Sequence, residues 1–192
     1  MYQTIDFHVR GVAPLLMHNG QLANPMNSIA KAMKAITSKR KKTDEDYAAL
    51  ANLEFMGGLY TDEQKRPVLP GEVIEGTIVA GAKKTKKGKD AKSAIIVDGN
   101  FPLIYDGPKT ADGLCGEERF RYVAGVVVGQ SRIMRTRPMF KTWECKFTVH
   151  YLDDVLNPQE VTDFVETAGR VAGFGDGRPR FGRFEVVSNS AV

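Results

Sequence analysis

Apolar and polar side chains alternate along the first ten residues of the chain. Ile5, Phe7 and Val9 fall on one side of an extended backbone, whereas the residues between them are polar or charged. A period of two is typical of a strand that buries one face. The same alternation returns from residue 143 to residue 151, which is therefore a second predicted strand.

Apolar residues at three- and four-residue intervals predict two main helices. The first covers residues 71–82. The second covers residues 158–172, where Asn157 suits the N-cap and Pro158 suits the first helical position. Helices of this length bury their apolar stripe against a sheet or another helix.

Residues 20–66 are predicted to form a helical insertion. Residues 27–37 can form a short helix with an apolar side. Thr43 is a predicted N-cap, and three acidic residues follow it in the first turn, where the helix dipole favours them. Gly57 and Gly58 are expected to end this second helix.

The segment between the two main helices is less regular. Residues 83–118 are expected to form a flexible basic loop and then a hairpin with its turn at residues 98–100. Residues 120–128 are apolar on both faces, which is typical of a central strand. Residues 131–139 are expected to be a basic connector, and a last strand is predicted to begin at Phe184.

Without the insertions, the predicted order is strand, helix, strand, strand, helix, strand. This βαββαβ order predicts an α+β fold with a ferredoxin-like or RRM-like core. Residues 1–192 are expected to form one domain, with insertions at about 20–66 and 83–118. A sheet of this kind has one open face, which commonly binds single-stranded nucleic acid.

The composition is that of a folded protein with no membrane segment. Apolar residues make up 42% of the chain, and no run of about 18 apolar residues occurs. The first residues lack the pattern of a secretion signal, so we expect a cytoplasmic protein. Cys115 and Cys145 have no partners at metal-ligand spacing, and we expect no metal, no disulfide and no cofactor.

Positive charge is concentrated in four short windows, at residues 31–42, 83–92, 132–141 and 170–183, although the net charge is only +4. Such clustering creates a local positive field that attracts polyanions. For any one window, a solvated lysine-rich loop is the simpler explanation. The cations that we predict to contact nucleic-acid phosphates are Lys39, Arg40, Lys41, Lys42, Lys83, Lys84, Lys86, Lys87, Arg132, Arg135, Arg137, Arg178, Arg180 and Arg183.

The last window lies in a glycine-rich segment, residues 173–183, which we call the glycine loop. Its glycines stand at positions 173, 175, 177 and 182, among three arginines. Glycine permits positive φ angles and close approach of a ligand, and arginine offers planar donors that suit phosphate. A helix stop explains Gly173 alone. A dinucleotide-binding fingerprint is excluded, because that motif runs from strand to glycines to helix. We therefore predict that the glycine loop holds a phosphodiester backbone.

Three aromatic residues, Phe140, Phe174 and Phe181, lie among basic residues instead of in apolar stripes. Exposed rings stack on bases, so these three are predicted to contact nucleic acid. The alternative is that each ring closes an edge of the sheet. His18 and Asn19, in a loop after the first strand, complete the predicted contact residues.

Three short motifs together resemble the RAMP superfamily, the RNA-binding proteins of CRISPR effector complexes. They are the segments from Pro14 to Asn19, from Leu69 to Gly76, and from Gly173 to Gly182. Glu75 departs from the family pattern, in which a lysine or arginine often lies near this place. The resemblance implies the RNA-binding backbone subunit, with protomers aligned along one RNA and other effector subunits as partners. A reduced or phage-borne relative is compatible with the short chain.

We therefore expect a non-catalytic subunit that binds single-stranded RNA, a guide RNA if the resemblance holds, and self-assembles along the strand. Single-stranded DNA shares the phosphate backbone and is a second possible ligand. One alternative is a metal-independent endoribonuclease in which His18 is the general base. The simpler interpretation of a lone histidine is a loop residue that donates one hydrogen bond or stacks on a base. Another alternative is an assembly protein whose basic patches bind acidic proteins.

Overall fold

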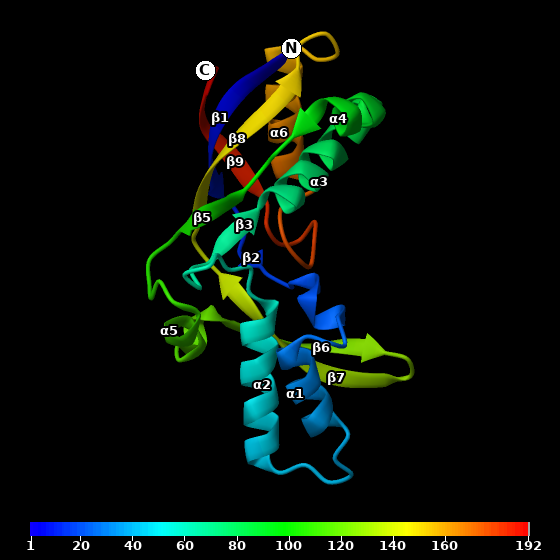
Figure 1. The fold of residues 1–192 in the computed structure, drawn as a ribbon, viewed down its shortest axis with the longest axis vertical. Coiled ribbons are helices and arrows are strands. Elements are labelled where there is room, and N and C mark those ends of the chain that lie inside the picture. The colour runs from blue at the N-terminus through cyan, green and yellow to red at the C-terminus, as the bar shows by residue number, and fades with distance from the viewer. Residues whose placement is uncertain (192) are drawn as a thin grey trace.

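The computed structural model describes residues 1–191, without the side chains of Val128, Ser131 and Ala191. Its main sheet contains β1 (Tyr2–Gly11), β3 (Val68–Pro70), β4 (Ile95–Ile96), β5 (Asn100–Ile104), β8 (Glu144–Leu152) and β9 (Phe184–Ala191). The strand order is β3-β5-β8-β1-β9, and β4 also pairs with β8. Neighbouring strands are antiparallel, and the first and last strands bring both chain ends to the same end of the sheet (Figure 1).

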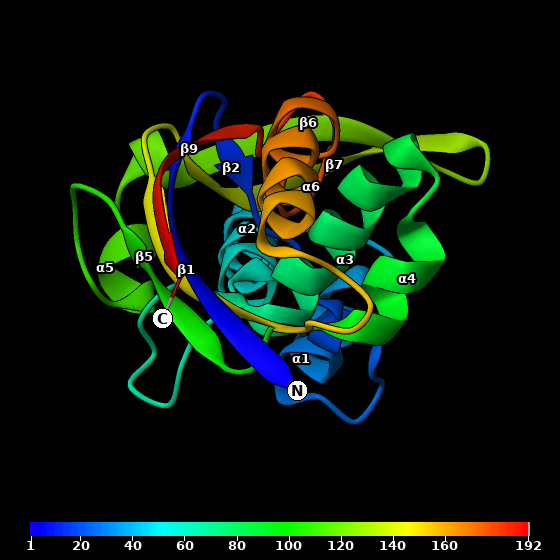
Figure 2. The ribbon, with the colours of Figure 1, turned by 90° about the horizontal axis from the view of Figure 1, so that it is seen from above.

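Helices cover one face of this sheet and leave the other face open (Figure 2). They are α3 (Gly71–Ala82), α4 (Gly88–Ala94) and α6 (Pro158–Val171). Asn157 caps α6 by accepting a hydrogen bond from the Glu160 amide, and Pro158 opens the helix, as predicted. α3 packs closely on α6 at Gly81, where a Cβ would lie 2.4 Å from the carbonyl oxygen of Phe164.

The predicted alternation places one face of β1 and β8 in the core. Ile5, Phe7 and Val9 are at most 3% exposed, and the ring of Phe7 stacks on Phe147 with centroids 5.6 Å apart. Cys145 is also fully buried, and this burial raises the pKa of its thiol to about 12. Removal of this apolar face from water is the main force that holds the sheet against the helices.

A second, smaller sheet packs against two further helices (Figure 1). Its strands are β2 (Leu15–Leu16), β6 (Arg121–Val128) and β7 (Ser131–Phe140), and the helices are α1 (Ser28–Thr37) and α2 (Asp44–Gly58). The strand order is β2-β7-β6, and α2 packs on β7. The remaining short elements are η1 (Gly20–Ala23), η2 (Lys83–Thr85), α5 (Ala111–Cys115) and η3 (Glu118–Phe120). The two helices predicted within residues 20–66 are thus observed, with Thr43 as the N-cap of α2.

The predicted α+β class is confirmed, but several predicted elements are reassigned. Residues 120–128 are not a central strand of the main sheet. They contribute β6, an edge strand of the smaller sheet, where Val123 and Val127 are 54% and 68% exposed. Residues 131–139, predicted as a connector, belong to β7 and pair with β6. β-Branched residues suit any strand, and their burial depends on a partner that the local pattern does not specify.

The hairpin predicted around residues 98–100 is also wrong. β4 and β5 flank this turn, but each pairs with β8 instead of with the other, and β5 pairs with β3 on its second side. The amide of Gly71 donates to the carbonyl oxygen of Gly99 at 2.8 Å, which ties the turn to the start of α3. β5 therefore takes the place of the second strand in the βαββαβ order.

Residues 83–92 form ordered helical turns, η2 and α4, instead of the predicted flexible loop. Ala91 and Ala94 of α4 are buried. The Lys87 ammonium lies 3.2 Å from the Glu160 carboxylate of α6, which fastens the segment to the helical layer. Within residues 1–191, no helix is long and apolar enough to cross a bilayer.

Candidate nucleic-acid interface

The glycine loop docks against β2. The Asp176 amide donates to the carbonyl oxygen of Leu16 at 2.8 Å, and the Gly182 amide donates to that of Pro14 at 2.8 Å. All four loop glycines have φ angles between +66° and +78°. At Gly175 a Cβ would lie 2.1 Å from the Leu16 oxygen, so only glycine permits this approach.

An ion pair joins the docked glycine loop to β7. Arg137 of β7 donates from Nε to the Asp176 carboxylate at 2.7 Å. The three loop arginines are exposed, and they are Arg178, Arg180 and Arg183. The Asp176–Arg137 pair therefore links the basic window of the glycine loop to the basic window of β7, which is distant in the sequence.

A hollow of about 610 Å³ lies between the glycine loop and the ends of α3 and α6. Its lining residues are Ala80, Val171, Ala172, Gly175, Asp176, Gly177, Arg178 and Pro179. Lys83 and Lys84 are exposed and follow Ala80 by about one helical turn, so they lie near the same side of α3. The third basic window therefore begins about one helical turn beyond this hollow.

A second hollow, of about 370 Å³, lies between the β6–β7 hairpin and the helical insertion; we call it the His18 pocket. Its lining residues are His18, Leu22, Ala23, Met33, Glu54, Val126, Arg135, Thr136 and Arg137. Arg135 and Arg137 are two positions apart on β7 and therefore share one face of the strand. Because Arg137 also holds Asp176, the pocket borders the docked glycine loop.

Glu54 of α2 holds β7 in place. It is 6% exposed, and its Oε2 accepts a hydrogen bond from the Thr136 amide at 2.7 Å while its Oε1 accepts one from Arg135 Nη1. A carboxylate is tolerated at such depth when both oxygens are paired. Sequence reasoning missed Glu54, because a helix pattern does not reveal a partner on a distant strand.

The environment of His18 lowers the pKa of its imidazole. Partial desolvation in the pocket disfavours the charged ring, and the charge of Arg137 adds repulsion, whereas Asp176 partly opposes both effects. Arg135 lowers this pKa further. His18 is therefore neutral at neutral pH, with one ring nitrogen as donor and the other as acceptor.

Hydrogen bonds hold the backbone around His18 and Asn19. The Tyr60 hydroxyl donates to the carbonyl oxygen of His18 at 3.0 Å. The side-chain amide nitrogen of Asn19 donates to the carbonyl oxygen of Leu59 at 3.0 Å. The side-chain oxygen of Asn19 accepts a hydrogen bond from the backbone amide of Gln21 at 3.0 Å. Both polar ends of the Asn19 side chain are thus engaged within the protein, and its contact with nucleic acid stays a prediction.

Two of the three aromatic predictions are wrong. Phe140 and Phe174 are fully buried, and Phe174 stacks on Phe184 with ring centroids 4.3 Å apart. Basic neighbours along the chain do not indicate which way a ring faces, and these rings face the core. Phe181 is half-buried and packs edge-on against Tyr122 of β6 at 5.3 Å. Sequence reasoning missed Tyr122, which lies opposite Arg137 in the hairpin.

The basic window at residues 39–42 lies apart from the other three. It follows α1, at the end of the molecule distant from the glycine loop (Figure 1). Lys39 pairs with Asp46 at 2.5 Å, and the Lys42 ammonium donates to the Lys39 carbonyl oxygen at 3.0 Å. A nucleic-acid contact in this window stays a prediction.

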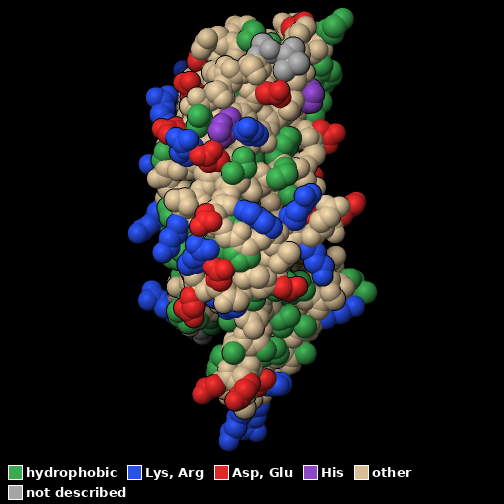
Figure 3. All heavy atoms as spheres, turned by 90° about the vertical axis from the view of Figure 1, so that its left-hand side faces the viewer, with side chains coloured by type: hydrophobic (Ala, Val, Ile, Leu, Met, Phe, Trp, Pro, Cys, Tyr) green, Lys and Arg blue, Asp and Glu red, His purple; other side chains and the backbone are tan. Residues whose placement is uncertain are grey.

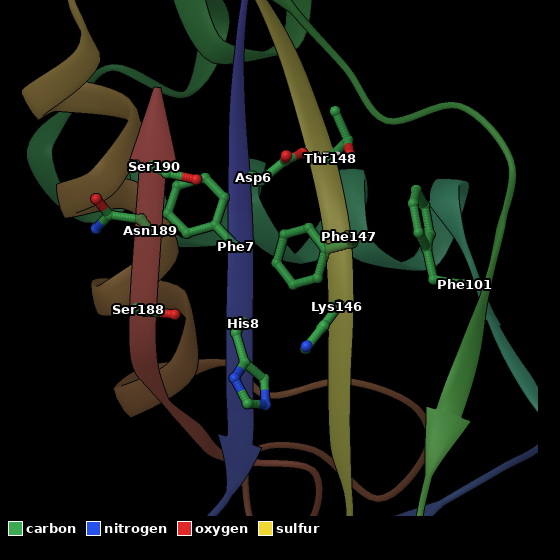
Figure 4. A pocket seen from close by; sticks show the side chains of 10 residues that line it. All are labelled: Asp6, Phe7, His8, Phe101, Lys146, Phe147, Thr148, Ser188, Asn189 and Ser190. Atoms are coloured by element: carbon green, nitrogen blue, oxygen red, sulfur yellow. Dashed lines mark hydrogen bonds between the residues drawn. The ribbon is translucent and has the colours of Figure 1, made fainter. Parts of the chain in front are cut away.

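The open face of the main sheet has polar side chains that pair with one another. The Thr148 hydroxyl donates to Asp6 at 2.6 Å, and Arg10 Nε lies 2.8 Å from Glu144. Figure 4 shows a hollow of about 350 Å³ at the centre of this face, with Lys146 at its border. Basic and acidic side chains are interspersed over this side of the molecule (Figure 3). The positive surface around the glycine loop is therefore the better candidate for a phosphate backbone.

Comparison of the sequence with known protein families finds no match, and comparison with curated proteins finds none. Solved structures do match. A chain in the cryo-EM structure of the Type III-B Cmr-beta bound to cognate target RNA matches 100% of this chain with a TM-score of 0.55 and 11% identity. The match covers 61% of that longer chain. The crystal structure of Cmr6 from Pyrococcus furiosus matches 97% of this chain and 99% of its own length, with 11% identity and a TM-score of 0.44.

The structural match supports a conclusion about the fold and leaves the ligand to be inferred from the site. The alignment with that chain extends over the whole length of this chain. The fold of this chain is therefore similar to that of a chain in this Cmr complex.

Proposed function

We propose that this protein is a non-catalytic subunit that binds single-stranded RNA in a CRISPR-type ribonucleoprotein. The observation that carries the proposal is the docked glycine loop, which carries exposed Arg178 and Arg180 and pairs through Asp176 with Arg137 of the His18 pocket. The similar fold of a chain in an RNA-bound Cmr complex supports it. This chain spans about three fifths of that chain, so RNA binding here is our inference from the site.

In this proposal the strand crosses the docked loop and the adjoining face of β7. Guanidinium groups hold phosphates in bidentate geometry. The edge-on pair of Phe181 and Tyr122 is the aromatic surface available for a base. We further propose that the 192 residues form one RAMP-like, ferredoxin-like domain in the cytoplasm, that the RNA is a guide RNA, and that copies assemble along it with other effector subunits.

Replacing both Arg178 and Arg180 with alanine is expected to weaken binding to a single-stranded RNA roughly tenfold or more, because two phosphate contacts are lost. The plot of log affinity against log salt concentration is expected to flatten by roughly 1.4, since each contact on a single strand contributes about 0.7 to the slope. Fluorescence anisotropy over a range of salt concentrations measures both quantities.

The matched control is the double variant Lys65→Ala and Lys92→Ala, which removes the same charge at exposed positions outside the predicted contact residues. It is expected to retain the salt slope of the unmodified protein. Equal losses in both variants would show that only net charge matters. Absence of RNA affinity in the unmodified protein, together with binding to acidic proteins, would replace the proposal with an assembly role.

A second candidate function is metal-independent cleavage of RNA, and the His18 pocket favours it. The neutral imidazole of His18 lies in the same hollow as Arg135 and Arg137, which suits a base beside a charged phosphate. We expect structured and single-stranded RNA to stay intact after long incubation with the protein and a metal chelator. Cleavage that disappears in His18→Ala would establish the enzyme instead.

A further inference from the structure

The His18 pocket is lined by both apolar and cationic side chains, whereas a surface that binds only phosphates needs no apolar lining. Four of its residues are apolar, and they come from three separate segments: Leu22, Ala23, Met33 and Val126. Val126 shares a face of the β6–β7 hairpin with Arg135 and Arg137, according to the strand register. Apolar surface therefore adjoins cationic surface within one hollow of about 370 Å³.

Both arginines in the pocket keep donors for a ligand. Among the described residues, Arg135 uses Nη1 on Glu54, and Arg137 uses Nε on Asp176. A guanidinium has five N–H donors, so each retains several. The two carboxylates fix the orientation of the guanidiniums without using up their hydrogen-bonding capacity, which is the arrangement that recognises a phosphate.

We propose that the His18 pocket holds one whole nucleotide, with its base against Leu22, Met33 and Val126 and its phosphate at Arg135 and Arg137. An acidic peptide supplies negative charge but no base-like ring. A lipid tail supplies apolar surface but no negative group for the two guanidiniums to bind. A nucleotide supplies both surfaces, and neutral His18 supplies a donor and an acceptor for the edge of the base. This inference rests on the proposed function, because the pocket borders the glycine loop along which we place the strand.

Filling the pocket tests the proposal without changing any charge. Ala23 is exposed and lines the pocket, so Ala23→Phe puts a ring where the base is expected. Ala35→Phe is the matched control, since Ala35 is exposed on α1 and does not line the pocket. Affinity for single-stranded RNA is expected to fall roughly tenfold in Ala23→Phe, within the range for losing one base contact, with an unchanged salt slope.

A second probe separates the base from the backbone. An oligomer of abasic ribose-phosphate units of the same length is expected to bind the unmodified protein and Ala23→Phe equally well, which also shows that the variant is folded. Equal affinity of both proteins for normal RNA would overturn the nucleotide pocket. If the Arg178 and Arg180 double variant still weakened binding in that case, the proposed function would stand.

Adenosine and uridine 5′-monophosphates distinguish the two sources of the nucleotide. Shifts of the methyl NMR signals of Leu22, Met33 and Val126 on titration would assign the pocket to a free nucleotide. If the same signals shift with RNA but not with either mononucleotide, the pocket is assigned to a nucleotide of the strand. Absence of shifts with both probes would overturn the pocket as a nucleotide site.

Discussion

Replacing Glu54 with alanine is expected to lower the free energy of unfolding by roughly 3 kcal/mol, because removal of one partner of a buried ion pair leaves the other uncompensated. Glu54 is 6% exposed, and its side chain accepts hydrogen bonds from Arg135 and from the Thr136 amide. The Arg135 side chain is 30% exposed and keeps some access to water, which places the cost at the low end of the usual range.

Urea denaturation followed by circular dichroism measures this change. Glu54→Gln keeps an oxygen for the Thr136 amide, so it is expected to lose less stability than Glu54→Ala. Glu63→Ala is the matched control, since Glu63 is exposed outside the helices, and it is expected to change stability by less than about 0.5 kcal/mol. A Glu54→Ala variant as stable as the control would show that β7 does not depend on α2.

The second large effect is expected at Gly81, where replacement by alanine should cost roughly 2 kcal/mol. The new Cβ would lie 2.4 Å from the carbonyl oxygen of Phe164 and 2.7 Å from the Ala168 nitrogen. Both are backbone atoms of α6, so the two helices have to separate to admit a methyl group. Overpacking of this kind costs about 1–3 kcal/mol in a well-packed core.

Gly76 provides a control in the same helix. A Cβ at Gly76 would meet no atom within 4 Å, and alanine is the better helix former. Gly76→Ala is therefore expected to raise the free energy of unfolding by about 0.5–1 kcal/mol. Opposite signs for these two variants would confirm the close contact of α3 with α6, whereas equal effects would contradict it.

Close helix contact and the buried ion pair also serve the proposed interface. Gly81 lets α3 and α6 meet beside the hollow that borders the glycine loop, and Glu54 orients Arg135 in the His18 pocket. Loss of either contact shifts residues that position the proposed interface, but it removes no exposed cation. Both variants should therefore weaken RNA binding through misplacement, with less change in the salt slope than the loss of Arg178 and Arg180 causes.

The sequence alone determined the features that depend on neighbouring residues. The period of two around Phe7 defined β1, and the caps at Thr43 and Asn157 defined the starts of α2 and α6. Caps and periodicities act over a few residues, so a local pattern contains all the information they need. The α+β class followed from the order of these elements.

Strand pairing in the middle of the chain could not be predicted in this way. Residues 120–128 have the composition of a central strand, yet they pair only with β7 and leave Val123 and Val127 exposed. The choice of partner depends on which edges remain free after the whole chain has folded. The same limit applies to Phe140 and Phe174, whose basic neighbours concealed buried rings.

The candidate site was recognised in part from composition, because glycines and arginines together are unusual and chemically specific. Which basic windows act together was decided by the tertiary structure alone. The hydrogen bond from Asp176 to Leu16 joins two segments that are distant in the sequence, and Glu54 reaches Arg135 from another element. Such contacts depend on distance in space, which residue spacing does not encode, and they unite His18, β7 and the glycine loop on one surface.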